Sequence, residues 1–348
     1  RAALGSSPTI NRRYLAKGLK SSPPAVEDTF YDAIQRFRPA HKAWFERINW
    51  RLSVVRYWDL EPEDISSLTT PEQVYDALRQ RLEEAVRSRI GTAKTVGSQL
   101  SGGLDSSAIK VLASRMLDPT WLHTFSYVQS DKTRAFSELG LDETHTQNEV
   151  LAYAGLSIEE LLRLRQVVMG GYAEMDCYWQ DPLYYEAAKQ GAEVLLSGFL
   201  GDEGISNGGH FYFYDYLHRH SLASLRQLWA DWGWQSVRKV GGYWLGRLTG
   251  TYVRGYKRIQ AKRSLLHPDS PYHQELRDES FLFVPTFKAM MKSRITGVLP
   301  MLRMESEAAY ASRYGIEVVY PLADVRLLRL VYSLPADYFK PSVFTRPV

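Results

Sequence analysis

The sequence has almost no cysteine: Cys177 is the only one in 348 residues. This excludes a disulfide framework within the chain and a zinc site built from several cysteines. As a lone internal cysteine, Cys177 is expected to be a small buried hydrophobic residue. Such scarcity is typical of a reducing compartment, so we expect a cytoplasmic location.

Long apolar segments and a strong charge imbalance are missing as well. No run of about 18 apolar residues occurs, and no charged segment followed by an apolar one opens the chain. Hydrophobic residues make up 45% of the sequence and charged residues 24%, which favours a folded globular protein. The net charge of +4 balances 43 basic against 39 acidic residues, so we expect neither nucleic acid nor a membrane as a partner. The sequence begins with Arg1 rather than Met, and we expect a processing boundary there.

Residues 70–90 carry the signature of an amphipathic helix. Thr70 is suited to cap it, Pro71 to occupy its first position and Gln73 to complete a capping box. Apolar residues follow at helical spacing, namely Val74, Leu78, Leu82, Ala85, Val86 and Ile90. We interpret the basic residues of this helix (Arg79, Arg81, Arg87 and Arg89) as a solvated face.

Strands and helices then alternate along the chain. Short strands are predicted at residues 95–100, 123–128 and 192–197, with a helix over residues 105–116, after an earlier isolated strand at 51–58. This alternation predicts an α/β fold with a doubly wound, mainly parallel sheet surrounded by helices. Ligands of such sheets bind at the carboxyl ends of the strands, where both glycine-containing motifs of this sequence fall.

The segment from residue 208 to 267 is rich in aromatic and basic residues. Helical packing is the simpler interpretation, and a wall for a substrate is the alternative. The segment also holds His210, His218 and His220, but no carboxylate or cysteine partner stands at ligand spacing, so we expect no metal site there.

The loop at residues 101–107 (SGGLDSS) has the composition of a pyrophosphate site. Gly102 and Gly103 let the backbone approach an anion and adopt positive φ, and the following helix directs its positive end to the same point. The hydroxyls of Ser101, Ser106 and Ser107 add uncharged donors. Asp105 would repel phosphates unless a divalent cation lies between them, so the loop is suited to a metal-bound pyrophosphate. The alternative is a plain strand-to-helix turn capped by serine and aspartate; the sequence lacks the lysine of a Walker A loop and the spacing of a dinucleotide fingerprint.

These residues resemble a known family. LSGGLDSS after a short strand looks like the PP-loop of the ATP pyrophosphatase superfamily, with its HUP-like fold, and in particular the synthetase domain of asparagine synthetases. SGFLGDE at 197–203 is similar to the second ATP-site loop of that family. EVVYPLAD at 317–324, followed by Leu334-Pro335, resembles the family's E-x-R-x-P-(F/L)-L-D and later LP, and Asp142-Glu143 resembles its DE after the second strand. The resemblance covers roughly residues 70–340.

The resemblance implies roles for individual residues. Asp105 and Asp202 match the aspartates that hold Mg²⁺ between phosphates, so the implied cofactors are ATP and Mg²⁺. The implied reaction is attack of a substrate carboxylate on the α-phosphorus, followed by transfer of the acyl group to an amine. The pyrophosphate cradle would consist of Ser101, Gly102, Gly103, Ser106 and Ser107, and the adenosine contacts of Leu100, Tyr127 and Gly198.

The second loop departs from the family at the position of a proposed proton acceptor. Asparagine synthetases normally read SGEG there, whereas this chain has Phe199 and Leu200. A phenyl ring accepts no proton, so we expect a neighbouring base, Glu203, to compensate. Similar losses occur in relatives that close rings, including β-lactam synthetases and lasso peptide cyclases.

The ends of the sequence also differ from the family. We expect residues 1–69 to be the tail of an N-terminal glutaminase-like (amidotransferase-type) domain plus a linker, and residues 70–348 to be the synthetase domain, incomplete at its C-terminus. The family continues with a lysine that stabilises the adenylation transition state, and Lys340 does not match it.

The preferred interpretation is an ATP-dependent amide-forming ligase of specialised biosynthesis, such as lasso peptide macrocyclisation. Its substrate would be a small-molecule or peptide carboxylate, and its partners a precursor peptide and a peptidase. The alternatives are a glutamine-hydrolysing asparagine synthetase and a non-catalytic ATP-binding partner.

Overall fold

The protein's structure is a computed structural model that describes residues 9–20, 22–127, 148–150, 180–206 and 286–339, with isolated residues between 226 and 272. Its Cα positions group the chain into two compact units. One unit takes in residues 1–59 and 211–290, and the other takes in residues 60–210 and 291–348. The expected organisation into domains 1–69 and 70–348 stays a prediction.

The described part of the first unit contains a short helix and a β-hairpin. Helix α1 spans Arg12–Leu19, and strands β1 and β2 span His41–Glu46 and Arg51–Arg56. The strands are antiparallel, and the strand expected at 51–58 is thereby confirmed. Phe45 lies opposite Leu52 and Ala43 opposite Val54, so the four residues share one apolar face of the hairpin. Phe45 and Leu52 are 54% and 60% exposed.

The second unit is built on a parallel sheet. In the described residues its strands are β3 (Val96–Gln99), β4 (Leu122–Tyr127), β5 (Asn148–Val150), β6 (Val194–Leu196) and β7 (Glu317–Val319). They lie in the order β5-β4-β3-β6-β7, and every neighbouring pair is parallel. From β3 the chain continues to β4 and β5 on one side of β3, and it then crosses to β6 and β7 on the other side. This reversal is the doubly wound arrangement. The predicted α/β class and the three predicted strands of this sheet are confirmed.

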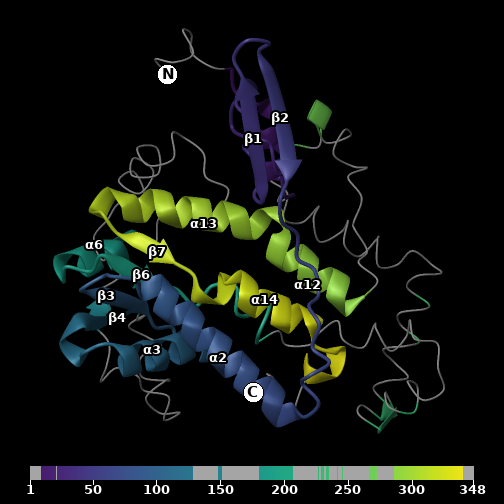
Figure 1. Cartoon of the computed structure of the whole chain (residues 1–348). Coiled ribbons are helices and arrows are strands. Elements are labelled where there is room, and N and C mark those ends of the chain that lie inside the picture. Colours follow the sequence, from purple (N-terminus) through teal and green to yellow (C-terminus); the bar gives the residue numbers. More distant parts are fainter. Residues whose placement is uncertain are drawn as a thin grey trace. The chain divides into compact units, whose positions relative to one another are not determined.

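Helices cover both sides of this sheet. They are α2 (Pro71–Ile90), α3 (Leu104–Met116), α6 (Asp181–Lys189), α13 (Val298–Ala311) and α14 (Val325–Ser333), while α12 (Phe287–Thr296) runs across the division between the units. Short 3-10 turns occupy Pro119–Trp121, Ser312–Tyr314, Pro321–Ala323 and Ala336–Phe339. Figure 1 shows α2 and α13 on opposite sides of the strands, with α3 beside α2. Within the described ranges, no helix combines the length and apolar character needed to cross a membrane.

The predicted start of α2 is confirmed in its capping interactions. The Thr70 hydroxyl oxygen accepts a hydrogen bond from the backbone N–H of Gln73 at 3.3 Å, and Gln73 Oε1 accepts one from the backbone N–H of Thr70 at 3.1 Å. The helix then buries apolar side chains against the unit, among them Val74, Ala85, Val86 and Ile90.

The core on the side of the sheet that α6 and α13 cover includes side chains of β4 and β6 that lie above Gly97 of β3. Phe125 of β4 and Leu195 of β6 pack with Tyr184 of α6 and Tyr310 of α13. A Cβ at Gly97 of β3 would lie 2.8 Å from Leu195 Cδ1 and 3.1 Å from Phe125 Cε2. Glycine at this strand position therefore lets the two larger side chains cover β3.

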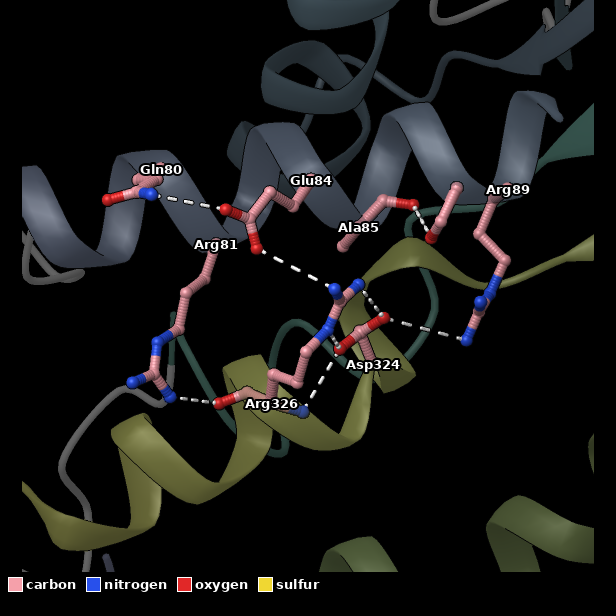
Figure 2. Close-up of polar contacts among 8 residues, drawn as sticks. Gln80, Arg81, Glu84, Ala85, Arg89, Asp324 and Arg326 are labelled. Carbon is pink, nitrogen blue, oxygen red and sulfur yellow. Dashed lines mark hydrogen bonds and ion pairs between the residues drawn. The ribbon is translucent and has the colours of Figure 1, made fainter. Parts of the chain in front are cut away.

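Ion pairs join α2 to α14 (Figure 2). Asp324, which caps α14, accepts hydrogen bonds from the backbone N–H, Nε and Nη2 of Arg326, each at 3.0 Å. Arg89 of α2 approaches the same carboxylate at 3.9 Å, and Arg81 donates to the carbonyl oxygen of Arg326 at 2.6 Å. Arg81 and Arg89 thus stay partly exposed, at 29% and 36%, and they also contact a segment that is distant in the sequence.

The charge of Asp324 should contribute measurably to stability. Burial alone would raise the pKa of this carboxyl, but hydrogen bonds from Arg326 and the charges of Arg326 and Arg89 hold the pKa below its usual value. The stabilisation is present above the usual pKa of about 4 and is lost as the pH falls through the lower native pKa. We expect Asp324→Asn to lower the free energy of unfolding by about 1–2 kcal/mol at neutral pH while retaining the helix cap, because Asn also caps helices.

Urea unfolding followed by circular dichroism, repeated from about pH 7 down to about pH 2, measures this effect. The difference between the wild type and Asp324→Asn should shrink as the pH falls. Asp76→Asn is the matched control, because it removes the same charge from α2 at a side chain that is 75% exposed. A difference that stays constant across the pH range would contradict the role of the charge.

Candidate functional site

The glycine-rich loop leaves the carboxyl end of β3 and opens α3. Gly102 has a φ of +76°, in the left-handed region that glycine adopts without strain, whereas Gly103 has a φ of −81° and precedes the helix. The helix begins at Leu104, one residue before its predicted start, and places Asp105 in its first turn. The predicted sequence of strand, glycine-rich turn and helix is therefore confirmed, and the positive end of α3 points into the loop.

Ser106 holds this loop together from inside. Its buried Oγ donates to the carbonyl oxygen of Gly103 at 3.1 Å and accepts from the backbone N–H of Ser101 at 3.1 Å. The Oγ atoms of Ser101 and Ser106 also lie 3.1 Å apart. The hydroxyl of Ser106 thus shapes the loop, and the expected pyrophosphate contacts of Ser101, Gly102, Gly103, Ser106 and Ser107 stay predictions.

A second loop, residues 197–206, follows β6 and packs directly on the first. Asp105 Oδ2 accepts a hydrogen bond from Ser206 Oγ at 2.9 Å. A Cβ at Gly201 would lie 2.1 Å from Asp105 Cγ, and a Cβ at Gly198 would lie 2.9 Å from the backbone nitrogen of Ser106. The two motifs identified in the sequence therefore meet at the carboxyl ends of β3 and β6, and both glycines are needed for the close approach.

Leu200 has an unusual backbone in this second loop. Its φ is +73°, although its side chain is branched and only 4% exposed. The left-handed conformation costs a non-glycine residue about 1–2 kcal/mol, which burial of the leucyl side chain offsets. The backbone at position 200 thus has a conformation that glycine adopts readily, although the residue there is leucine.

The two loops line a cavity of about 520 Å³ at the switch point of the sheet. The expected catalytic residues Asp105, Asp202 and Glu203 all line it. A hollow of about 690 Å³ lies along residues 88–93 and 317–320, but its described lining includes no residue of either loop. We therefore assign the functional site to the smaller cavity, because ligands of doubly wound sheets bind at the switch point.

Glu203 is the carboxyl of this cavity with a raised pKa. Burial is the main cause, and the charge of Asp202 adds to it, whereas a backbone hydrogen bond and the charges of Arg294 and Arg303 oppose it. A carboxyl of this kind is suited to proton transfer.

The described residues contain no group of three His, Cys, Asp or Glu side chains able to hold a metal ion. A magnesium ion bound to Asp105 and Asp202 would therefore take its other ligands from phosphate oxygens and water, as this ion commonly does. The metal roles of the two aspartates stay predictions.

Two further cavity residues, Arg303 and Gln180, were not identified from the sequence. Arg303 lies on α13 with its guanidinium carbon 4.2 Å from the ring centre of Phe199, and its Nε donates to Glu307 Oε1 at 2.7 Å. The sequence signal that could have indicated the pair of Arg303 and Glu307 is its i, i+4 spacing on a helix. No local pattern indicated that the pair would reach the cavity.

Of the three residues expected to contact adenosine, two line the cavity and the third has its side chain outside the described residues. Gly198 lines the cavity, and so does Leu100, whose N–H donates to the carbonyl oxygen of Phe125 at 2.9 Å while its own carbonyl oxygen accepts from Ser126 Oγ. Tyr127 ends β4, and its side chain lies outside the described residues. The other residues singled out in the sequence that lie outside them are Asp142, Glu143, Cys177, His210, His218, His220, Lys340 and most of the segment 208–267.

The fold and the cavity define a class of protein. A parallel sheet whose switch point holds a glycine-rich loop opening a helix is the architecture of a doubly wound α/β protein. Residues 77–342 match the sequence profile of the Asparagine synthase family, which is more than half of the chain. The chain belongs to the asparagine synthase family.

Individual relatives agree with this assignment at low identity. The chain is 24% identical to asparagine synthetase [glutamine-hydrolyzing] 3 of Bacillus subtilis over 96% of its own length and 54% of the relative's. It is 26% identical to Amidase chry2 of Gibberella zeae and 27% identical to Amidase chyE of Penicillium rubens, in each case over 58% of this chain and 32% of the relative. The chain thus spans between about a third and about half of the length of these relatives.

Proposed function

We propose that the chain is an ATP-dependent amide-forming ligase, which adenylates a substrate carboxylate, releases pyrophosphate and transfers the acyl group to an amine. The observation that carries the proposal is the contact of the two loops, which fixes Asp105 against Gly201 and beside Ser206 at the edge of one cavity. The family and the doubly wound sheet support it, and we assign the sheet to the PP-loop, HUP-like type.

The residues present fit ATP and magnesium. The left-handed backbone of Gly102 and the first turn of α3 suit a pyrophosphate, and the Asp105 carboxylate is held in place by Ser206. Asp105 and Asp202 would hold magnesium, which neutralises charge on phosphate oxygens when bound. Leu100, Gly198 and Tyr127 would contact adenosine.

The first step joins a carboxylate oxygen of the substrate to the α-phosphorus of ATP. The bond from that phosphorus to the bridging oxygen breaks, and pyrophosphate leaves with the electron pair. The loop contributes by positioning the phosphates and by presenting donors to the charge on the leaving group.

In the second step an amine nitrogen attacks the acyl carbon, and AMP leaves with the electron pair of the broken carbon–oxygen bond. The amine must lose a proton during this step. Phe199 accepts none, so we assign the proton to Glu203, which lines the same cavity and has a raised pKa.

Glu203→Gln should separate the two steps. We expect amide formation to fall by about 100-fold or more, because general-base catalysis contributes roughly this much, while pyrophosphate release from the first step persists. In the wild type the acid limb of amide formation should lie above the usual pH range of a glutamate, because the Glu203 pKa is raised. Quantifying the amide product by mass spectrometry and the released pyrophosphate by a coupled assay, each against pH, measures both effects, with Glu305→Gln on α13 as the control. Equal loss of both steps would contradict the role as base.

We assign the reaction to specialised biosynthesis and prefer lasso peptide macrocyclisation, with a precursor peptide and a peptidase as partners and the cytoplasm as the location. Phe199 in place of a proton-accepting glutamate supports ring closure over ammonia transfer. A glutamine-hydrolysing asparagine synthetase is the second candidate, favoured by the relative from Bacillus subtilis that is named as one. In that case the β1–β2 hairpin, whose apolar face is exposed, would belong to the tail of a glutaminase-like domain.

Pyrophosphate release from Mg·ATP tests these proposals. Release with a peptide bearing a side-chain carboxylate supports ring closure, whereas release stimulated by aspartate and ammonia would replace it with asparagine synthesis. Tight ATP binding with no release under either condition would favour a non-catalytic ATP-binding partner.

A further inference from the structure

An arginine faces the cavity at the position where the family's proton-accepting glutamate is replaced. Arg303 and Phe199 both line the cavity, and the side chain of Arg303 is 30% exposed. The guanidinium carbon lies 4.2 Å from the centre of the Phe199 ring. At this distance the positive charge of a guanidinium is attracted to the negative face of an aromatic ring. Phe199 therefore serves as a platform that orients a cation.

A buried carboxylate fixes one edge of the same guanidinium. Glu307 is fully buried, and its Oε1 accepts a hydrogen bond from Arg303 Nε at 2.7 Å. Its Oε2 accepts one from the Tyr320 hydroxyl at 2.8 Å, and Gln180 Nε2 donates to Oε1 at 3.3 Å. The Tyr320 ring also meets Phe199 edge to face at 6.0 Å. Glu307 is thus held by three side chains, and it sets the position of Arg303.

We propose that Arg303 binds an oxyanion at the reaction centre, supplied by the substrate carboxyl group or by the α-phosphate of ATP, and that Glu307 is its positioning residue. The inference rests on the proposed function, because the same cavity must receive ATP. Planar carboxylate and phosphate oxygens are the groups that a guanidinium recognises best. Glu203, the proposed base, lines the same cavity as Arg303.

The inference also gives a physical reason for Phe199. A glutamate at this position would set a second carboxylate against a guanidinium that Glu307 already holds. That carboxylate would compete with the substrate oxyanion for the same cation. A phenyl ring at this position keeps Arg303 oriented without setting a second carboxylate beside it.

Calorimetric titration with two probes tests the inference. One probe is α,β-methylene-ATP with magnesium chloride, and the other is 5′-O-(N-acetylsulfamoyl)adenosine, which carries an acyl group in place of the substrate carboxyl. We expect Arg303→Gln and Phe199→Glu each to weaken binding of the sulfamoyl probe by about 10-fold to 100-fold, the range for loss of a charged hydrogen bond. Arg303→Lys should recover part of the affinity, and Glu307→Gln should lose it through Arg303.

The pattern of losses identifies the source of the oxyanion. Loss confined to the sulfamoyl probe supports the substrate carboxyl group, and equal loss for both probes supports the α-phosphate. Retained affinity for both probes in Arg303→Gln would overturn the inference while leaving the proposed function intact, and failure of the wild type to bind either probe would overturn both. Arg79→Gln is the control, since it changes an exposed arginine of α2 outside the described cavity lining. Melting temperatures of all variants separate misfolding from loss of the binding group.

Discussion

Asp105→Asn should reduce ATP-dependent pyrophosphate release by about 100-fold or more, because it removes a charged ligand of the proposed magnesium ion. The asparagine side chain has the same size, and it can still accept the hydrogen bond that Ser206 Oγ gives to Asp105 Oδ2 at 2.9 Å. The packing of the two loops should therefore persist. The expected defect is in metal-dependent chemistry and leaves the melting temperature nearly unchanged.

The measurement is a coupled pyrophosphate assay over a range of magnesium concentrations. Asp76→Asn serves as the control, because it removes the same charge from an exposed site on α2. Full activity of Asp105→Asn at every magnesium concentration would remove Asp105 from the proposed metal site. Partial recovery at high magnesium would fit a weakened ligand.

Gly201→Ala should reduce the same activity by a steric route. The added methyl group would lie 2.1 Å from Asp105 Cγ and 2.3 Å from its Oδ2, so the carboxylate has to leave its position. The backbone of Gly201 does not have positive φ, and the effect is therefore one of space. We expect pyrophosphate release to fall about as far as in Asp105→Asn, with a loss of about 1–3 kcal/mol in stability from overpacking.

Gly204→Ala is the matched control in the same loop. A Cβ there would have its nearest neighbour, the carbonyl oxygen of Leu200, at 3.4 Å, which is ordinary van der Waals contact. In the background of Asp105→Ala, the change Gly201→Ala should cost little further stability, because the clashing atoms are gone. Thermal melting of the four combinations measures this coupling, and additive losses would show that Gly201 acts independently of Asp105.

Features that depend on neighbouring residues were predictable from the sequence. The capping box of Thr70 and Gln73 and the strand–loop–helix around Gly102 are set by local backbone preferences and by side chains within a few residues. The parallel sheet followed from the alternation of strands and helices. The three expected catalytic residues, Asp105, Asp202 and Glu203, do line one cavity.

Other features required the fold, because their partners are distant in sequence. The contact between Asp105 and Ser206 joins residues 101 positions apart, and that between Arg81 and Arg326 joins residues 245 apart. A basic helix face that contacts another segment and one that meets only solvent have the same sequence pattern, so the contacts of Arg81 and Arg89 could not be predicted. The left-handed backbone of Leu200 was equally hidden, because leucine rarely adopts it.

The sequence by itself determined the glycine-rich turn that opens α3, the doubly wound sheet and the family resemblance, since these reside in short segments and in their order. Only the tertiary structure decided what surrounds the loop. Packing of β6 beside β3 brings Gly201 against Asp105, and packing of α13 on the sheet brings Arg303 over Phe199. In the sequence, Phe199 indicated only that a proton-accepting glutamate is absent from this position. In the folded chain it is the surface on which a cation is held, because the arginine that gives it this role lies on a separate helix.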